Sequence, residues 1–116
     1  MTADYETAII EHFIDLYERD GNLLGLVEMI PQPNCLLIEN IAVHPTCQGE
    51  GLGNLLLKHA EEHAASLGLD ETRLYTNAKF AANLAFYAKR GYSEFCREAV
   101  AAGTVAVHMR KLVARS

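Results

Sequence analysis

Three glycines at alternate positions form the pattern in this sequence that most clearly indicates chemistry. Gly49, Gly51 and Gly53 follow the apolar run 35–43 and come directly before an amphipathic helical stretch. A glycine-rich turn that opens a helix leaves backbone N–H groups without partners, and the helix dipole attracts an anion to them. Glycine also lets the backbone approach a ligand closely because it has no Cβ. The pattern therefore predicts that a phosphate-bearing ligand binds at residues 48–54.

Two common phosphate-binding motifs do not fit this loop. Gly53 is followed by Asn54 and Leu55, so the Lys-Ser/Thr pair that ends a Walker A loop is missing. The dinucleotide-binding fingerprint would need its third glycine at Asn54, and the acid that should end the next strand is absent from Tyr-Thr-Asn at 75–77. The remaining pattern is Gln-x-x-Gly-x-Gly from Gln48, after a strand that ends in Ile-Ala-Val-His-Pro.

The flanking residues predict an α+β fold in one domain, residues 1–116. We expect a β-hairpin from 8–18 and 23–30, a strand at 35–43, a helix at 52–67, a strand at 72–76, a helix at 81–90, and strands at 92–98 and 104–112. The run 35–43 is nearly continuously apolar, which is typical of a central strand buried on both faces. The first helix carries apolar or small residues at 52, 55, 56, 60, 64 and 67, with Lys58, Glu61 and Glu62 on the opposite side. The order β-β-β-α-β-α-β-β predicts a mixed, mostly antiparallel twisted sheet with two helices packed on it.

Composition excludes several classes of protein. The net charge is −5 and the basic residues are scattered, so we expect no nucleic-acid partner. No apolar run approaches the roughly 20 residues that span a membrane, and the first residues show no signal-peptide pattern. The three cysteines form no C-x-x-C pair, which is typical of reduced thiols in a cytoplasmic protein. An acidic surface suits a cationic small molecule, although it also serves plain solubility.

A second motif, taken together with the glycine loop, indicates a protein family. Residues 83–92 read Asn-Leu-Ala-Phe-Tyr-Ala-Lys-Arg-Gly-Tyr, a helix with a tyrosine and then, after three residues, Gly-Tyr. With the loop, this resembles the GNAT superfamily of N-acetyltransferases over about residues 8–112. The resemblance implies acetyl-CoA as cofactor, with its pyrophosphate on the loop amides and its pantetheine arm along the preceding strand. The cofactor-binding residues that it implies are Ile41, Ala42, Val43, Gln48, Gly49, Glu50, Gly51, Leu52, Gly53, Asn54, Asn83, Phe86 and Tyr87.

Acetyl transfer from a thioester to an amine sets three chemical requirements. The ammonium must lose a proton, the developing oxyanion needs hydrogen-bond donors, and the departing thiolate leaves more easily when protonated. The resemblance implies that Tyr87 lies by the CoA sulfur as general acid and that Asn83, one helical turn earlier, bonds the CoA arm. The oxyanion donor would be a backbone N–H, such as that of Val43. The alternatives are that Tyr87 only packs against the sheet and that Asn83 is a surface amide.

Glu39 is the best candidate for the general base. It is a carboxylate in an otherwise apolar strand, where burying a charge is costly, so its presence indicates either a partner or a functional role. Its alternative is an ion pair with a lysine or arginine across the sheet. His44 could serve instead, although a solvent-facing place in the turn fits it better, and a water chain could replace any single base.

A short pattern with two histidines raises the question of a metal site. His59 and His63 frame an H-x-x-E-H sequence, which resembles the inverted zincin motif. No third ligand presents itself, and the helix already follows the phosphate loop, so we expect the polar edge of a packed helix and no metal. Cys47 beside the loop is expected to be an incidental small residue rather than a nucleophile.

The N-terminal region differs from the usual pattern of the family. Members usually begin with a strand and two helices, which commonly form part of the acceptor pocket, whereas this chain starts almost at the hairpin. A missing first strand would leave a sheet edge exposed, which favours a homodimer. The expected function is acetylation of a primary amine on an unidentified acceptor: a polyamine, amino acid, antibiotic, protein N-terminus or lysine. The alternative is a non-catalytic CoA-binding module with an incomplete acceptor site.

Overall fold

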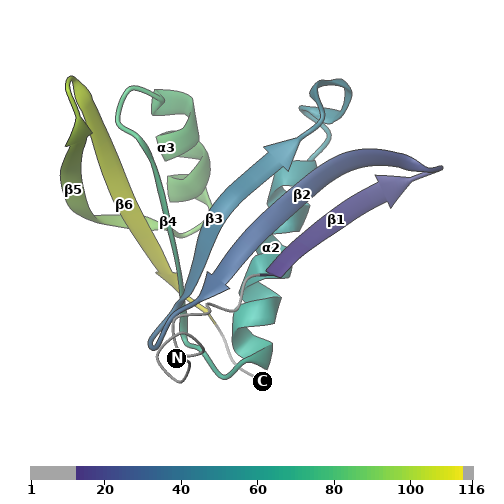
Figure 1. Cartoon of the computed structure of the whole chain (residues 1–116), viewed down its shortest axis with the longest axis horizontal. Coiled ribbons are helices and arrows are strands. Elements are labelled where there is room, and N and C mark those ends of the chain that lie inside the picture. The colour runs from purple at the N-terminus through teal and green to yellow at the C-terminus, as the bar shows by residue number, and fades with distance from the viewer. Residues whose placement is uncertain (1–12, 114–116) are drawn as a thin grey trace, which may run out of the picture.

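The computed structural model describes residues 13–113, which form one six-stranded sheet with two α-helices (Figure 1). The elements are β1 (Phe13–Arg19), β2 (Asn22–Pro31), β3 (Leu36–Val43), the 3-10 turn η1 (Pro45–Cys47), α2 (Leu52–Ser66), β4 (Glu71–Asn77), α3 (Ala81–Lys89), β5 (Ser93–Ala101) and β6 (Thr104–Leu112). This order of strands and α-helices is the predicted one. Residues 8–12, the start of the first predicted strand, lie outside the described part of the chain.

The sheet is mixed and mostly antiparallel, as predicted. Its strand order is β1-β2-β3-β4-β6-β5, and the only parallel neighbours among the described strands are β3 and β4. These two strands pair only at Leu36 with Thr72 and at Leu37 with Arg73. Beyond that point they diverge, so the two halves of the sheet form the V seen in Figure 1. We call the opening between β3 and β4 beyond these pairs the fork.

Glu39 forms a β-bulge in β3. Glu28 of β2 lies opposite Asn40, and Met29 lies opposite Ile38, so Glu39 is an extra residue without a partner on β2. A bulge bends its strand and re-aims the side chains that follow. The bulge therefore sits where β3 begins to leave β4.

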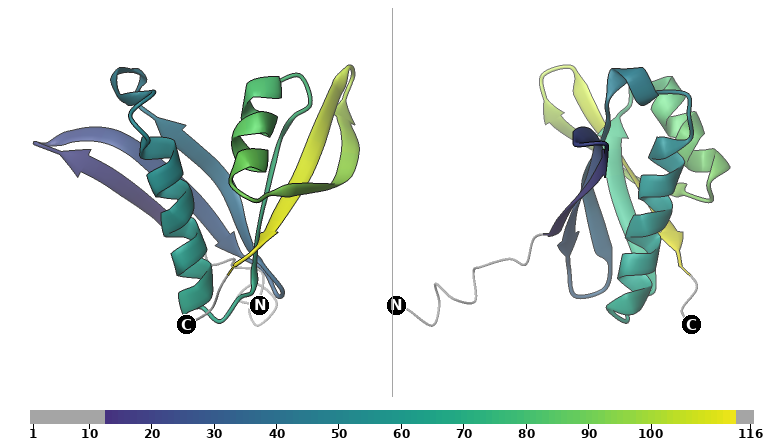
Figure 2. Two further views of the ribbon diagram at one scale, coloured as in Figure 1. Left: turned by 180° about the vertical axis from the view of Figure 1, so that it is seen from behind. Right: turned by 90° about the vertical axis from the view of Figure 1, so that its right-hand side faces the viewer.

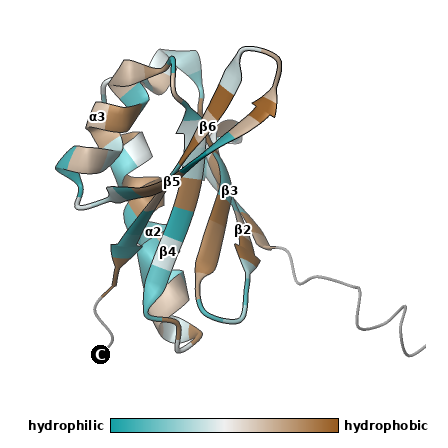
Figure 3. Ribbon diagram, turned by 90° about the vertical axis from the view of Figure 1, so that its left-hand side faces the viewer, coloured by the Kyte–Doolittle hydropathy of each residue, from teal (hydrophilic) through white to brown (hydrophobic). Residues whose placement is uncertain are grey.

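Burial of β3 differs from the prediction in its second half. Hydrophobic residues run along β2 and β3 (Figure 3), and Leu36 and Ile38 are buried, but Asn40 and Ala42 are exposed. The expectation that 35–43 is buried on both faces is wrong there. The physical reason is that both helices lie on one side of the sheet (Figure 2), so Ile41 and Val43 pack against the core whereas Asn40 and Ala42, which alternate with them, have no helix to cover them.

Helix α2 packs on β2, β3 and β4, and Figure 2 shows it on the same side of the sheet as α3. Its buried residues are Leu52, Leu56, Leu57, Ala60 and Ala64. The predicted face was partly wrong, because Leu55 and Leu67 are 50% and 41% exposed whereas Leu57 is 1% exposed. Gly25 of β2 allows close approach, since a Cβ there would lie 3.1 Å from side-chain carbons of Leu52 and Leu56.

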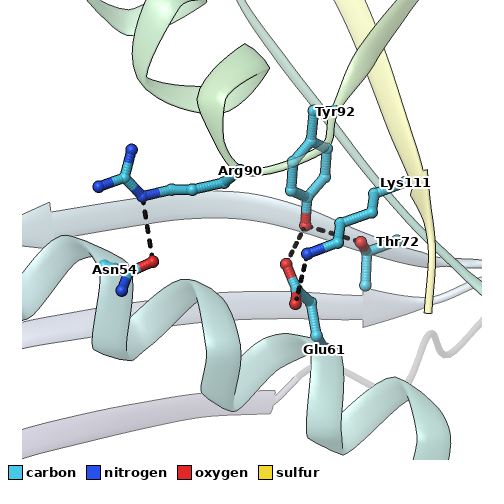
Figure 4. Close-up of polar contacts among 6 residues, drawn as sticks. All are labelled: Asn54, Glu61, Thr72, Arg90, Tyr92 and Lys111. Carbon is cyan, nitrogen blue, oxygen red and sulfur yellow. Dashed lines mark hydrogen bonds and ion pairs between the residues drawn. The ribbon is translucent and has the colours of Figure 1, made fainter. Parts of the chain in front are cut away.

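A buried polar cluster ties α2 to the second half of the sheet (Figure 4). The Tyr92 hydroxyl donates to Glu61 Oε2 at 3.0 Å and lies 2.7 Å from Thr72 Oγ1, while Lys111 Nζ donates to Glu61 Oε1 at 3.0 Å. Because the phenol has one proton, the Thr72 hydroxyl is the donor in its own contact. Burial raises the pKa of Tyr92 well above its usual range. Glu61 therefore faces inward, contrary to its predicted place beside Lys58.

No helix within residues 13–113 has both the length and the apolar character needed to cross a bilayer.

Candidate active site

A groove of about 680 Å³ opens beside the start of α2, the end of β3 and one face of α3. It is lined by Ile41, Val43, Cys47, Gln48, Gly49, Gly51, Leu52, Gly53, Asn54, Asn83, Phe86, Tyr87 and Arg90. The set contains every predicted cofactor-binding residue except Ala42 and Glu50. Residues from three separate stretches of sequence therefore meet at one hollow.

The glycine loop leaves backbone donors beside this groove. Gly49 and Gly51 have φ values of +88° and +82°, a left-handed conformation that side chains with a Cβ adopt at a cost. Gly51 is the N-cap of α2 and provides no side-chain capping bond, so the N–H groups of the first turn have no intrahelical acceptor. At Gly53 a Cβ would lie 3.5 Å from Phe86 Cζ, so a larger side chain there would fill the space between α2 and α3. This loop can bind a phosphate through its main chain.

The fork contains a second, smaller hollow of about 160 Å³. It is lined by Ile38, Glu39, Asn40, Ile41, Leu74, Tyr75, Thr76, Asn83 and Tyr87. Ile41, Asn83 and Tyr87 also line the groove, so the two hollows adjoin. The fork thus brings the predicted base, Glu39, and the predicted acid, Tyr87, to one place.

Tyr75 is the partner of Glu39, and sequence reasoning missed it. Its hydroxyl donates to Glu39 Oε2 at 2.5 Å across the fork, and its ring lies 5.7 Å from that of His108. The hydrogen bond to Glu39 raises the pKa of Tyr75, and burial adds to the effect. The structure therefore gives Glu39 a phenol as partner, not the lysine or arginine considered as its alternative. No sequence signal marked Tyr75, because it appeared only as one residue of a short β-rich run.

Tyr87 lies at the junction of the two hollows. Its ring packs edge-on against Phe86 and Tyr92, with ring centroids 5.3 Å and 6.0 Å away. Burial raises the pKa of Tyr87, which keeps its proton on the phenol at neutral pH. Its hydroxyl has no hydrogen-bond partner among residues 13–113. Asn83 donates to Thr76 Oγ1 at 3.3 Å and so joins α3 to β4.

Three residues weighed for the site are not among those that line the groove or the fork. Ala42 lines a separate hollow near Leu24, and Glu50 lines another near Arg19. His44 Nδ1 accepts a hydrogen bond from the Thr46 backbone N–H at 3.2 Å and caps η1. The side chain of His44 thus has a structural partner in the loop and does not line the fork.

Two groove residues were not among the predicted ligands. Cys47 is a free thiol and is 6% exposed. Arg90 follows the last residue of α3, where a basic residue is also a common helix ending. Because a basic residue is common at a helix ending, Arg90 was not predicted as a ligand, although it lies within the second motif.

The two histidines of the H-x-x-E-H pattern have separate contacts. His59 Nε2 lies 2.5 Å from Asp15 Oδ2, and the His63 ring packs edge-on against Phe13 at 4.7 Å. Within residues 13–113, no three His, Cys, Asp or Glu side chains are grouped to hold a metal ion.

The chain belongs to the acetyltransferase (GNAT) family. The model of that family matches residues 2–92. Mycothiol acetyltransferase of Tsukamurella paurometabola is 40% identical over 80 residues, which cover 66% of this chain and 27% of that protein. The chain therefore spans about a quarter of the length of this curated relative.

Solved structures support the fold. Nourseothricin acetyltransferase matches with a TM-score of 0.80 and 23% identity, over 89% of this chain and 66% of that one. The ribosomal-protein-S18-alanine N-acetyltransferase of Escherichia coli matches at 0.80 and 21%, over 97% and 77%. A GNAT acetyltransferase of Elizabethkingia anophelis, solved with acetyl-CoA bound, matches at 0.80 and 19%, over 95% and 80%. These likenesses confirm the predicted architecture.

Proposed function

We propose that this chain is an acetyl-CoA-dependent N-acetyltransferase that acetylates a primary amine. One observation carries the proposal: the groove beside the glycine loop adjoins a fork that holds both a carboxylate, Glu39, and a protonated phenol, Tyr87. A binding site for a phosphate-bearing ligand and a pair of acid–base groups are thus next to each other.

The residues at the groove fit acetyl-CoA. The first-turn N–H groups at 51–54 would hold the pyrophosphate, since they lack intrahelical acceptors and lie at the positive end of the helix dipole. The edge of β3 at 41–43 has no pairing with β4, so its main chain is available to the amides of the pantetheine arm. When bound, acetyl-CoA supplies a thioester whose carbonyl carbon accepts the amine and whose sulfur departs as a thiolate.

Tyr87 would act as the general acid. Its raised pKa keeps the phenol protonated at neutral pH, and its hydroxyl has no described partner to compete for the proton. The departing thiolate would accept a hydrogen bond and then the proton from the Tyr87 phenol as the C–S bond breaks. Because the pKa of a free thiol, near 8.5, lies below that of the phenol, this transfer is uphill, and the phenolate would regain its proton from solvent.

Glu39 would act as the general base. Tyr75 holds one carboxylate oxygen, Oε2, and Oε1 has no hydrogen-bond partner among the described residues. Oε1 could take the proton of an incoming ammonium group, directly or through one water. A carboxylate at the fork would also attract a cationic acceptor.

A homodimer in the cytoplasm remains our proposal for the assembly and its location. Strand β1 is an edge of the described sheet, and its Ile14 and Leu16 are 54% and 55% exposed. An exposed apolar edge strand favours pairing with another chain. The free thiols Cys35, Cys47 and Cys96 suit a reducing compartment. A monomer in sedimentation at micromolar concentration would contradict the dimer.

The test follows thiol release from acetyl-CoA over a panel of amines: a polyamine, free amino acids, an aminoglycoside, and peptides offering an N-terminus or a lysine. We expect turnover with at least one class. Tyr87→Phe should lower kcat by about 100-fold or more while the affinity for CoA changes by less than about threefold, since only proton transfer is lost. If CoA binds but no amine is acetylated, the chain is a non-catalytic CoA-binding module and the proposal fails.

A further inference from the structure

Arg90 is held in place on the wall of the groove (Figure 4). Its Nε donates to Asn54 Oδ1 at 3.0 Å, and its Nη1 donates to the Phe86 backbone oxygen at 2.9 Å. Its guanidinium carbon lies 3.7 Å from the centre of the Phe86 ring. The side chain thus bridges the end of α3 and the first turn of α2, so little conformational freedom would be lost on binding a ligand.

The charge of Arg90 is not compensated within the described protein. No carboxylate in residues 13–113 forms an ion pair with it, and Nη2 has no hydrogen-bond partner there. The other residues that line the groove carry no basic side chain. An anionic ligand in the groove would supply the counter-ion that the described protein does not.

The neighbours of Arg90 suit a phosphate. Asn54 belongs to the first turn of α2, where the free backbone N–H groups and the positive end of the helix dipole lie. A guanidinium presents several N–H donors in one plane, a geometry that matches phosphate oxygens. Two independent sources of positive potential, one from the backbone and one from a side chain, therefore border the same groove.

We propose that Arg90 binds a phosphate group of the ligand in this groove. The inference rests on the proposed function and deepens it, because CoA carries two kinds of phosphate: the pyrophosphate and the 3′-phosphate monoester. Both offer the same anionic oxygens to Arg90, and ligands that lack one or both of them distinguish the source.

The experiment measures equilibrium binding of CoA, 3′-dephospho-CoA and pantetheine to the wild-type chain, to Arg90→Gln and to Lys89→Gln. Lys89 is the matched control, since it is the adjacent cation, is exposed and does not line the groove. Losing a charge-assisted hydrogen bond should weaken CoA binding by about 10- to 100-fold in Arg90→Gln. Lys89→Gln should stay within about twofold of wild type, and pantetheine should bind all three chains equally.

The three ligands separate the two sources. Equal weakening of CoA and 3′-dephospho-CoA in Arg90→Gln assigns Arg90 to the pyrophosphate, and weakening of CoA alone assigns it to the 3′-phosphate. Unchanged CoA affinity in Arg90→Gln overturns the inference. Equal weakening of pantetheine also overturns it, because Arg90 would then act only as a tie between α2 and α3. If the wild-type chain binds none of the ligands, the proposed function fails as well.

Discussion

The hydroxyl of Tyr75 donates a hydrogen bond of 2.5 Å to Glu39 across the opening between β3 and β4. The two strands are no longer paired at this level, since their register ends at Leu37 and Arg73. The contact therefore joins the two halves of the sheet where the backbone does not. It also fixes the direction of the one carboxylate in the fork.

The first prediction concerns this pair. Glu39→Ala should lower the pKa of Tyr75 towards the ordinary tyrosine value of about 10, because the variant removes both the acceptor and its negative charge. Tyrosinate absorbance during an alkaline titration measures the shift, and Tyr75→Phe identifies the step that belongs to Tyr75. Glu94→Gln, which removes an exposed carboxylate paired with Arg97, is the control and should leave the curve unchanged. Superimposable curves for Glu39→Ala and wild type would show that the contact is not formed.

The second prediction concerns the buried hydroxyl of Tyr92. Tyr92→Phe should lower the free energy of unfolding at neutral pH by about 1–3 kcal/mol, because Thr72 and Glu61 each lose a buried hydrogen-bond partner. Chemical denaturation measures the change. Tyr17→Phe, which removes a less buried phenol, should cost much less.

Tyr92 also predicts how stability depends on alkaline pH. Its pKa is raised in the folded chain, so the unfolded chain releases this proton first as pH passes about 10. The stability that Tyr92 contributes is complete below that pH and is lost as pH rises towards the folded pKa, at up to about 1.4 kcal/mol per pH unit. Tyr92→Phe should show a shallower alkaline decline than wild type, and an equally steep decline would contradict the assignment.

The third prediction compares two glycines in the same strained conformation. Gly51 and Gly103 have φ values of +82° and +73°, and a Cβ at either would meet nothing within 4 Å. Alanine at each position should cost about 1 kcal/mol of stability for the left-handed backbone. Only Gly51→Ala should weaken CoA binding, by about tenfold or more, because it moves the N-cap that positions the loop amides. Equal CoA affinities of the two variants in calorimetry would exclude the loop as the phosphate site.

Short-range patterns predicted much of this fold. The glycine spacing before an amphipathic stretch predicted the start of α2 at Leu52, and Gly68 after the helix has the left-handed φ of +77° that a helix ending favours. The order of strands and helices followed from runs of apolar residues and turn signals, because each of these depends on neighbours in sequence.

Features that depend on distant residues could not be predicted in this way. The bulge at Glu39 depends on register with β2, and the fork depends on where β3 leaves β4. The roles of Tyr75 and Arg90 likewise arise only when segments far apart in the sequence meet. The burial of Leu57 in place of Leu55 is different in kind, because Leu57 precedes Ala60 by three residues and Ala64 by seven, so helical periodicity already favours it for the buried face.

The most direct test of the account is an NMR titration of the isotopically labelled chain with CoA, read at the backbone amides. The account predicts that the largest shifts fall on Gly49, Gly51, Gly53 and Asn54, with further shifts at 41–43 of β3 and along α3. The hairpin of β5 and β6 around Gly103 should not respond. Binding that leaves the three loop glycines unshifted, or that shifts mainly β1 and the outer strands, would contradict it.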